Sequence, residues 1–208
     1  MTEEEARARL EGSVSRETFA KLELYAAALV KWQKAINLVS PSTIPELWTR
    51  HFLDSAQVYD LCPSQEGHWV DIGSGAGFPG LVCAAIASEK APCFRFTFIE
   101  SDLRKGSFLR TVAMELGLKI GVLTRRIEES PPQNADVLSA RALAPLGKLL
   151  GYAERHLAPD GTALFLKGAT HSLEVKEALE TWRMTMESVP SQTAAEAVVL
   201  KIGDLRRV

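Results

Sequence analysis

A glycine-rich turn between two apolar segments constrains this chain more than any other feature. It spans residues 70–80 and reads Val-Asp-Ile-Gly-Ser-Gly-Ala-Gly-Phe-Pro-Gly. The apolar run at 69–72 predicts a short buried strand, and the apolar run at 81–87 predicts a buried helix. Glycines let such a turn bend sharply and let a ligand approach the backbone closely. A strand, a glycine turn and a helix N-terminus together predict a nucleotide-binding site.

The acid at the end of the first strand indicates which nucleotide is bound. Residues 75–80 match the G-x-G-x-x-G of dinucleotide-binding enzymes. In those enzymes a pyrophosphate lies over the turn, where the carboxylate of Asp71 would repel it. S-adenosylmethionine carries a sulfonium and an ammonium group and no phosphate, so a carboxylate suits it. We therefore predict an S-adenosylmethionine site that includes Asp71, Gly73, Gly75 and Gly77.

Composition limits the class of protein. With 208 residues, 46% of them hydrophobic, the chain suits one domain with a small extension. The net charge of −2 means that any nucleic-acid-binding surface must be local. Cys62, Cys83 and Cys93 lack metal-ligand spacing, and the acidic N-terminus is not a targeting peptide. No apolar run approaches the roughly 20 residues that cross a bilayer. We therefore expect a cytoplasmic protein without a bound metal or membrane contact.

Strand and helix patterns alternate along the rest of the chain. Helices are predicted at 1–12 (loosely held), 15–36, 44–55, 81–87, 101–116 (capped by Ser101), 146–157 and 172–182. Strands are predicted at 69–72, 93–99, 120–123, 135–142 and 162–166 (after a turn at 159–161), with a closing pair at 185–189 and 195–202. This order predicts an α/β fold, a mostly parallel seven-stranded sheet of the Rossmann-like class I methyltransferase type. We expect residues 1–60 to form an N-terminal helical extension and residues 61–208 the methyltransferase domain.

Charged residues end three of the predicted strands. Ligands of open α/β sheets bind at the carboxyl ends of the strands. Glu100 is placed there to bind the ribose hydroxyls of a nucleoside. Arg141 is placed to face the substrate, with a buried salt bridge to a loop acid as the alternative. Lys167 falls at the same edge of the sheet.

Two further polar clusters have a functional and a structural interpretation. His51 and Asp54 could share one helix face beside the glycine turn, or could form an ordinary capping and ion-pair cluster. Arg104, Lys105 and Arg110 could contact phosphates, or could form a solvated helix face.

Several separated motifs, between about residues 25 and 203, resemble those of the RsmG (GidB) family. Members of that family are guanine-N7 methyltransferases of the small-subunit ribosomal RNA. The motifs are Asn37-Leu38-Val39-Ser40, Arg50-His51-Phe52-Leu53-Asp54-Ser55, residues 71–80, Glu100-Ser101 with Arg104-Lys105 and Phe108-Leu109, residues 126–129, Arg141-Ala142 and Leu166-Lys167-Gly168.

The resemblance implies a substrate, a partner and cofactor contacts. The substrate would be a guanine in the 530 loop of bacterial 16S RNA, met in the small ribosomal subunit or an assembly intermediate, and we expect a monomer. S-adenosylmethionine would contact Gly73, Phe78, Ile127, Glu128 and Arg141.

Guanine N7 carries a lone pair and no proton, so the reaction needs alignment of N7 with the methyl group and does not need a general base. Arg141 and Lys167 suit the cofactor carboxylate, guanine O6 or phosphates. We expect Arg141 to span cofactor and substrate, with Lys167, His51 and Asp54 as further catalytic candidates.

Three other functions remain open on the sequence alone. An NAD-dependent oxidoreductase would need a proton-transferring side chain, and we find no Tyr-x-x-x-Lys pair. A small-molecule methyltransferase would need an aromatic lid, and only 7% of the residues are aromatic. A non-catalytic ribosome-assembly factor would not need the intact glycine turn or Glu100.

Overall fold

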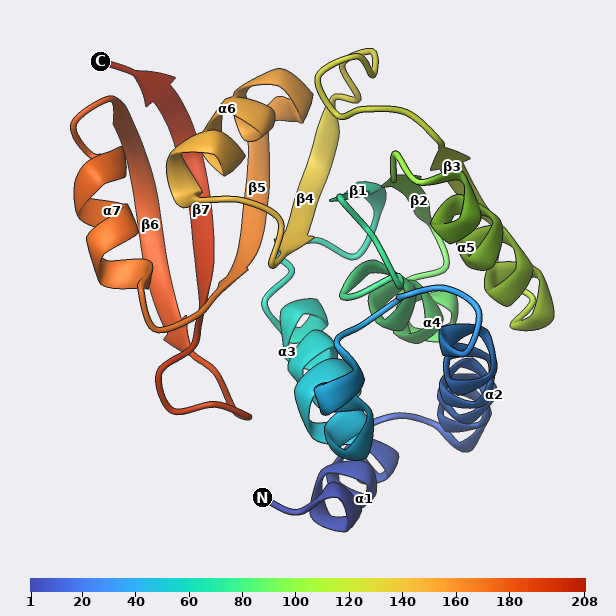
Figure 1. Cartoon of the computed structure of the whole chain (residues 1–208). Helices are drawn as coiled ribbons and strands as arrows, with labels where there is room; N and C mark the ends of the chain where they lie inside the picture. The colour runs from blue at the N-terminus through green and yellow to red at the C-terminus, as the bar shows by residue number, and fades with distance from the viewer.

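A seven-stranded sheet forms the centre of the protein, in the order β3-β2-β1-β4-β5-β7-β6 (Figure 1). The structure is a computed structural model that describes residues 1–208. The strands are β1 (Gly67–Ile72), β2 (Phe94–Ile99), β3 (Ile120–Leu123), β4 (Ala135–Arg141), β5 (Leu157–Lys167), β6 (Trp182–Pro190) and β7 (Val198–Arg207). β1 to β5 pair in parallel, whereas β7 runs antiparallel to both β5 and β6. The predicted Rossmann-like α/β fold is confirmed.

Helices cover both faces of the sheet. They are α1 (Glu3–Ser13), α2 (Arg16–Gln33), the 3₁₀-helix η1 (Pro41–Glu46), the π-helix η2 (Trp48–Leu53), α3 (Asp54–Asp60), α4 (Gly80–Lys90), α5 (Leu103–Glu115), α6 (Leu146–His156) and α7 (His171–Ala178). α4 and α5 cover one face, with α1 to α3 packed outside them, while α6 and α7 lie on the other face (Figure 1). No helix is both long and apolar enough to cross a membrane.

The strand order reverses between β1 and β4. From β1 the chain moves outward to β2 and β3, and it then returns to place β4 on the other side of β1. Open α/β sheets bind ligands in the crevice beyond the carboxyl ends of the strands at such a reversal. The glycine turn follows β1 and Arg141 ends β4, so the fold brings both to this crevice.

The N-terminus of α4 packs directly on β1. A Cβ atom at Gly80 would lie 2.5 Å from Phe98 Cε1 and 2.8 Å from Asp71 Cβ. Glycine at this position therefore allows the helix to approach the strand closely. The close approach buries the apolar side chains that follow the turn. Every residue from Gly80 to Ala87 is buried, which explains why this helix shows no polar face in the sequence.

The N-terminal helices belong to the main core. Residues 1–12, expected to be loosely held, form a firmly packed helix. Thr2 and Glu5 make a capping box at the start of α1, and Ala6 and Leu10 are fully buried. Ser15 caps α2 through the Thr18 N–H, as predicted. The apolar side chains of α1 to α3 lie in one continuous cluster with those of α4 and α5.

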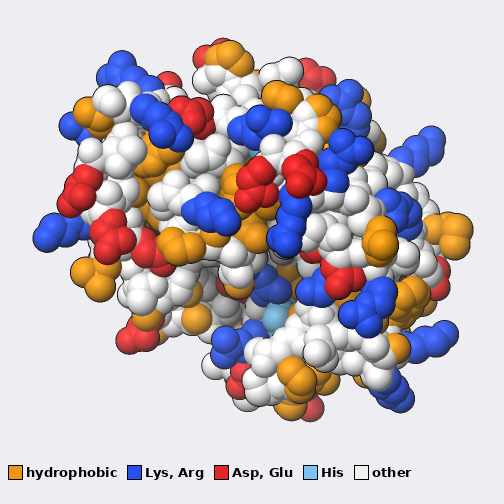
Figure 2. All heavy atoms as spheres, turned by 45° about the horizontal axis from the view of Figure 1, so that its top comes forward, with side chains coloured by type: hydrophobic (Ala, Val, Ile, Leu, Met, Phe, Trp, Pro, Cys, Tyr) orange, Lys and Arg blue, Asp and Glu red, His pale blue; other side chains and the backbone are white.

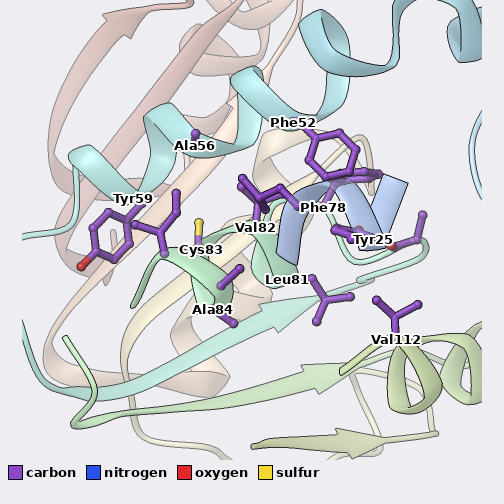
Figure 3. Close-up of a cluster of buried hydrophobic side chains, with 14 of the residues drawn as sticks. Tyr25, Phe52, Ala56, Tyr59, Phe78, Leu81, Val82, Cys83, Ala84 and Val112 are labelled. Carbon is purple, nitrogen blue, oxygen red and sulfur yellow. Dashed lines mark hydrogen bonds between the residues drawn. The ribbon is translucent and has the colours of Figure 1, made fainter. Parts of the chain in front are cut away.

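Aromatic rings join the N-terminal helices to the glycine turn. Tyr25 of α2 stacks on Phe78 with 5.2 Å between ring centroids, and Phe52 of η2 packs edge-on against both rings (Figure 3). The Tyr25 hydroxyl also donates to the carbonyl of Ala76. The turn is therefore held from outside the sheet as well as by β1.

Several predicted boundaries were wrong. The helix predicted at 44–55 is divided into η1, η2 and the start of α3. Asp102, rather than Ser101, caps α5, accepting from the N–H groups of Arg104 and Lys105; both residues suit a cap, and the sequence alone did not separate them. α7 ends at Ala178, and Trp182 is buried as the first residue of β6. Residues 159–161, expected as a turn, lie in an irregular part of β5.

Candidate functional site

A cleft of about 920 Å³ lies at the carboxyl ends of the strands. It is lined by the N-terminal segment, η1 and η2, the glycine turn, the ends of β4 and β5, and residues 191–198 between β6 and β7. Figure 2 shows a hollow in this part of the surface, with a histidine in it and Lys and Arg side chains around it. His51, Asp54, Gly73, Gly75, Phe78, Arg141 and Lys167 of the predicted site residues line the cleft.

The glycine turn presents open backbone to the cleft. Gly73 and Gly75 have φ of +62° and +54°, a conformation that glycine adopts without strain. A Cβ atom at Gly75 would have no neighbour nearer than 3.8 Å, so free space lies next to the backbone there. A Cβ atom at Gly73 would instead lie 2.4 Å from Leu143 Cδ1. Gly75 is thus the position where a ligand can approach the turn most closely.

Glu100 is tied to the glycine turn. Its Oε2 accepts from the N–H of Gly75 at 2.7 Å, and its Oε1 accepts from the N–H of Asp102 at 2.8 Å. The carboxylate is buried and lies outside the cleft lining. It joins the carboxyl end of β2 to the turn after β1, which fixes the two segments that a nucleoside would bridge.

Asp71 lies beneath the turn rather than on the cleft surface. It is 1% exposed and does not line the cleft. Its Oδ1 accepts from Ser139 Oγ at 2.6 Å, and Ser139 Oγ in turn accepts from Trp69 Nε1 at 2.9 Å. Oδ2 has no hydrogen-bond partner. Burial raises the pKa of Asp71 to about 7, because removing the carboxylate from water penalises its charged form.

Arg141 forms the centre of the cleft floor. One guanidinium nitrogen donates to the carbonyl of Arg50 at 2.9 Å, and the other donates to His51 Nδ1 at 2.7 Å. Its Cζ atom lies 4.8 Å from the centre of the Phe78 ring. Asp54 Oδ2 is 4.0 Å away, a looser contact than the predicted alternative of a buried salt bridge. The side chain is only 17% exposed, so these contacts fix its orientation.

His51 is held as a neutral imidazole. Because an arginine can only donate, Nδ1 must accept, and the ring proton must lie on Nε2. Nε2 then donates to Thr43 Oγ1 at 2.8 Å, and that hydroxyl donates to the carbonyl of Ser40 at 2.7 Å. Burial, followed by the charges of Arg141 and Arg50, lowers the pKa of His51 to about 3. This chain connects Arg141 to the loop before η1.

Asp54 connects Arg141 to the segment between β6 and β7. Its Oδ1 accepts from Gln57 at 2.7 Å, Thr193 at 3.0 Å and Ser191 at 3.2 Å. Burial raises the pKa of Asp54, and the nearby Arg141 charge opposes that rise. Asp54 therefore fixes the segment that forms one wall of the cleft.

Lys167 is paired with an acid inside the cleft. Its ammonium group contacts Glu174 and donates to the carbonyl of Ala144 at 3.1 Å. Glu174 also accepts from the N–H of Leu146 at 2.7 Å, so the pair joins the end of β5 to the starts of α6 and α7.

The other predicted cofactor residues lie outside the cleft. At Gly77, φ is +96°, and Leu81 Cδ1 lies 2.6 Å from where a Cβ atom would be. Ile127 is buried among the side chains packed around α6. Glu128 accepts from Tyr152 at 2.6 Å and lies 3.7 Å from Lys148. Their roles toward a cofactor stay predictions.

The sequence analysis missed several cleft residues. Thr43, Ser191 and Thr193 make the hydrogen bonds described above, and Glu3 of α1 also lines the cleft. Glu3, Ser191 and Thr193 reach the site from segments far away in the chain, while Thr43 lies eight residues before His51 across an irregular helix start, and no local spacing pattern signals such contacts. The polar run Ser191-Gln192-Thr193 was the one local hint, since it interrupts a predicted strand pair.

Solved structures of similar shape define the fold of this protein. An S-adenosylmethionine-dependent methyltransferase from Aquifex aeolicus superposes with a TM-score of 0.59 at 20% identity, covering 79% of this chain and 99% of that one. A ribosomal protein L11 methylase from Lactobacillus delbrueckii subsp. bulgaricus gives 0.58 at 16% identity, covering 73% and 76%. Together with the glycine turn at the strand reversal, these likenesses show a Rossmann-like fold that this protein shares with solved methyltransferases.

The sequence comparisons are more specific. A family model described as GidB, rRNA small subunit methyltransferase G, matches residues 18–199. Relatives named ribosomal RNA small subunit methyltransferase G are 52% identical in Ruegeria sp. (strain TM1040), over 98% of this chain and 99% of the relative, and 50% identical in Cereibacter sphaeroides (strain ATCC 17029), over the whole of both. The chain belongs to the rRNA small subunit methyltransferase G family, as its motifs predicted.

The buried Asp71 should make stability depend on pH. The folded protein holds the Asp71 proton up to about pH 7, whereas the unfolded chain releases it near the ordinary value of 3.8. The contribution of Asp71 to the free energy of unfolding therefore falls as pH rises from about 4 to about 7. Asp71→Asn, which stays neutral, should gain stability relative to the wild type over that range. Urea unfolding at a series of pH values measures this.

Asp160→Asn, at an exposed aspartate away from the glycine turn, is the control for the substitution itself. A constant difference in unfolding free energy between Asp71→Asn and the wild type from about pH 5 to about pH 8 would show that Asp71 is ionised throughout.

Proposed function

We propose that this protein transfers a methyl group from S-adenosylmethionine to N7 of a guanine in the 530 loop of bacterial 16S ribosomal RNA. The family membership over residues 18–199 supports a methyltransferase of small-subunit RNA. The observation that carries the proposal is the meeting of the glycine turn with Arg141 in one cleft large enough to admit a base. Because the substrate belongs to the bacterial ribosome, we expect a cytoplasmic enzyme, acting as a monomer.

The residues present fit S-adenosylmethionine. Open space next to Gly75 allows a nucleoside to approach the backbone. Asp71 Oδ2 is a buried oxygen without a partner beneath the turn, and a cation bound above it would favour the ionised form of this carboxyl group. The turn would hold the cofactor together with Glu100, while Phe78 and Arg141 would lie at its reactive end. The bound cofactor supplies an electrophilic methyl group.

The protein's own groups suit a reaction without a general base. N7 of guanine has a free lone pair, and His51 Nδ1, the basic atom of the ring, already accepts from Arg141. His51 is therefore a positioning residue. The guanidinium of Arg141 keeps N–H groups that the Arg50 and His51 contacts do not use, and these can donate to guanine O6. Held in a fixed plane, Arg141 can orient the base for in-line attack.

We propose that the two parts of the chain have separate tasks in this reaction. Residues 61–208 form the methyltransferase domain, which holds the cofactor. Residues 1–60 form the helical extension, which contributes His51 and Asp54 around Arg141. Family membership leaves no support for the oxidoreductase alternative. An activity measurement distinguishes the proposed enzyme from a non-catalytic assembly factor with the same fold.

The cleft cations differ in how far they are neutralised. Arg50 lies 3.5 Å from Glu46, Arg141 lies 4.0 Å from Asp54, and Lys167 contacts Glu174. Lys105, at the start of α5, lines the same cleft and has no ion-pair partner. An ammonium group without a carboxylate partner is free to bind a phosphate. We propose that Lys105 contacts the RNA backbone.

Mapping N7-methylguanine in 16S RNA tests the proposal directly. RNA from cells that carry this gene should show the modification in the 530 loop, and RNA from cells without it should not. Restoring the gene should restore the modification, which controls for secondary effects. Unmodified RNA in both strains, or a modified base elsewhere, would contradict the proposed substrate.

Arg141→Lys should slow catalysis. The ammonium group keeps the charge but loses the planar pair of hydrogen bonds to Arg50 and His51 and the contact with Phe78. We expect the single-turnover rate on small subunits, at saturating cofactor, to fall roughly tenfold to a hundredfold, which is about 1.4–2.7 kcal/mol of activation free energy.

Arg155→Lys is the matched control. Arg155, like Arg141, makes two guanidinium hydrogen bonds, but both go to the backbone carbonyl of Ser130, away from the cleft. Equal rates for Arg141→Lys and the wild type, with weaker cofactor binding, would instead make Arg141 a cofactor-binding residue.

Lys105→Gln should weaken binding to small subunits and reduce its dependence on salt. Loss of one phosphate contact lowers the slope of log K against log salt by about one. Lys176→Gln, at an exposed lysine of α7 outside the cleft, controls for the change in net charge. Equal slopes for the two variants, measured in equilibrium binding assays at constant Mg²⁺, would exclude a phosphate contact at Lys105.

A further inference from the structure

One carboxylate joins the first turn of α1 to the start of η2. Glu3 Oε2 accepts from the N–H of Trp48 at 2.8 Å, and Oε1 accepts from the N–H of Thr49 at 2.9 Å. The first N–H groups of a helix have no partner within the helix, and no side chain caps η2 at its own N-cap residue. A carboxylate there also meets the positive end of the helix dipole. Glu3 therefore fixes where η2 begins.

The helix that carries Glu3 is itself held rigidly. Ala6 and Leu10 anchor α1 in the main hydrophobic core, with no exposed surface. The guanidinium of Arg7 lies over the Trp48 ring at 5.7 Å, and Trp48 stacks on Phe19 with 5.6 Å between centroids. α1 and the start of η2 are therefore packed as one unit.

The residues directly after Thr49 hold Arg141. The carbonyl of Arg50 and Nδ1 of His51 are the two acceptors for the Arg141 guanidinium. Glu3 is thus separated from the centre of the cleft by less than one turn of η2. The family model begins at residue 18, so α1 lies outside the part of the chain that it describes.

We propose that Glu3 is a positioning residue for methyl transfer. By fixing the first turn of η2, it holds the Arg50 carbonyl and the His51 ring where they orient Arg141. This inference rests on the proposed function, in which Arg141 orients the guanine. Glu3 itself touches neither substrate nor cofactor in this scheme.

Paired alanine variants in the full-length protein test the inference. Glu3→Ala should lower the single-turnover rate at saturating cofactor by about tenfold, because a small misplacement of Arg141 is enough to slow the reaction. Glu4→Ala should change it by less than about twofold. Glu4 is exposed and makes no contact with η2, so its substitution removes the same charge from the first turn of α1 without disturbing η2. Thermal unfolding should confirm that both variants fold.

A double-mutant cycle separates positioning from general destabilisation. If Glu3 acts through Arg141, the variant that combines Glu3→Ala with Arg141→Lys should be no slower than Arg141→Lys alone. Multiplied effects of the two substitutions, or equal rates for Glu3→Ala and Glu4→Ala, would overturn the inference.

A measurement without turnover distinguishes failure of this inference from failure of the proposed function. In nitrogen NMR of the unliganded protein, Glu3→Ala should shift the His51 Nδ1 resonance and speed amide exchange at Trp48 and Thr49. Glu4→Ala should do neither. An unchanged His51 resonance in Glu3→Ala would overturn the inference whether or not the wild type methylates RNA. If the His51 resonance shifts in Glu3→Ala but the wild-type protein does not methylate RNA, the proposed function is overturned. The coupling of Glu3 to His51 is then still supported.

Discussion

The arrangement of the cleft depends on how one guanidinium is held. Arg141 reaches the cleft because β4 returns beside β1, but β4 does not decide which way its side chain points. The N-terminal helices do so, through the Arg50 carbonyl, the His51 ring and the stacked ring of Phe78. A cation that is only 17% exposed needs such partners, since desolvation opposes its charge. The N-terminal helices thus complete a site that the sheet begins.

The same contacts explain why the titratable groups of the cleft differ so much. Burial, followed by the charge of Arg141, lowers the pKa of His51 to about 3 and keeps its ring neutral. Asp71, buried without a cation in contact, has its pKa raised to about 7. His51 is too weak a base, and Asp71 does not line the cleft, so neither is placed to remove a proton from a substrate there. Guanine N7 already carries a lone pair and needs no general base, so the electrostatics of the cleft agree with the proposed chemistry.

Local patterns in the sequence were enough to predict the fold and to identify the charged residues at the strand ends. The glycine turn, the strand-end positions of Glu100, Arg141 and Lys167, and the alternation of strands with helices all follow from short-range rules. Contacts between distant segments do not. Asp71 was expected to face the cofactor because it ends a strand, yet the close packing of Gly80 on β1 leaves it beneath the turn. The π-helical form of η2 and the Glu3 contact likewise depend on tertiary packing.

The proposed division of labour between the N-terminal helices and the sheet has a physical basis. A Rossmann-like sheet supplies a backbone turn and strand-end side chains, which suit a cofactor of fixed shape. It offers few groups on the open side of the crevice, where a large RNA must enter. Here that side is built from η1, η2 and the 191–198 segment, joined through Asp54 and Arg141. η1 reaches Arg141 through the hydrogen bond between Thr43 and His51, and the 191–198 segment reaches it through Asp54, whose Oδ2 lies 4.0 Å from the guanidinium. Under the proposed function, a substrate that displaces either segment would therefore also change the contacts that orient Arg141.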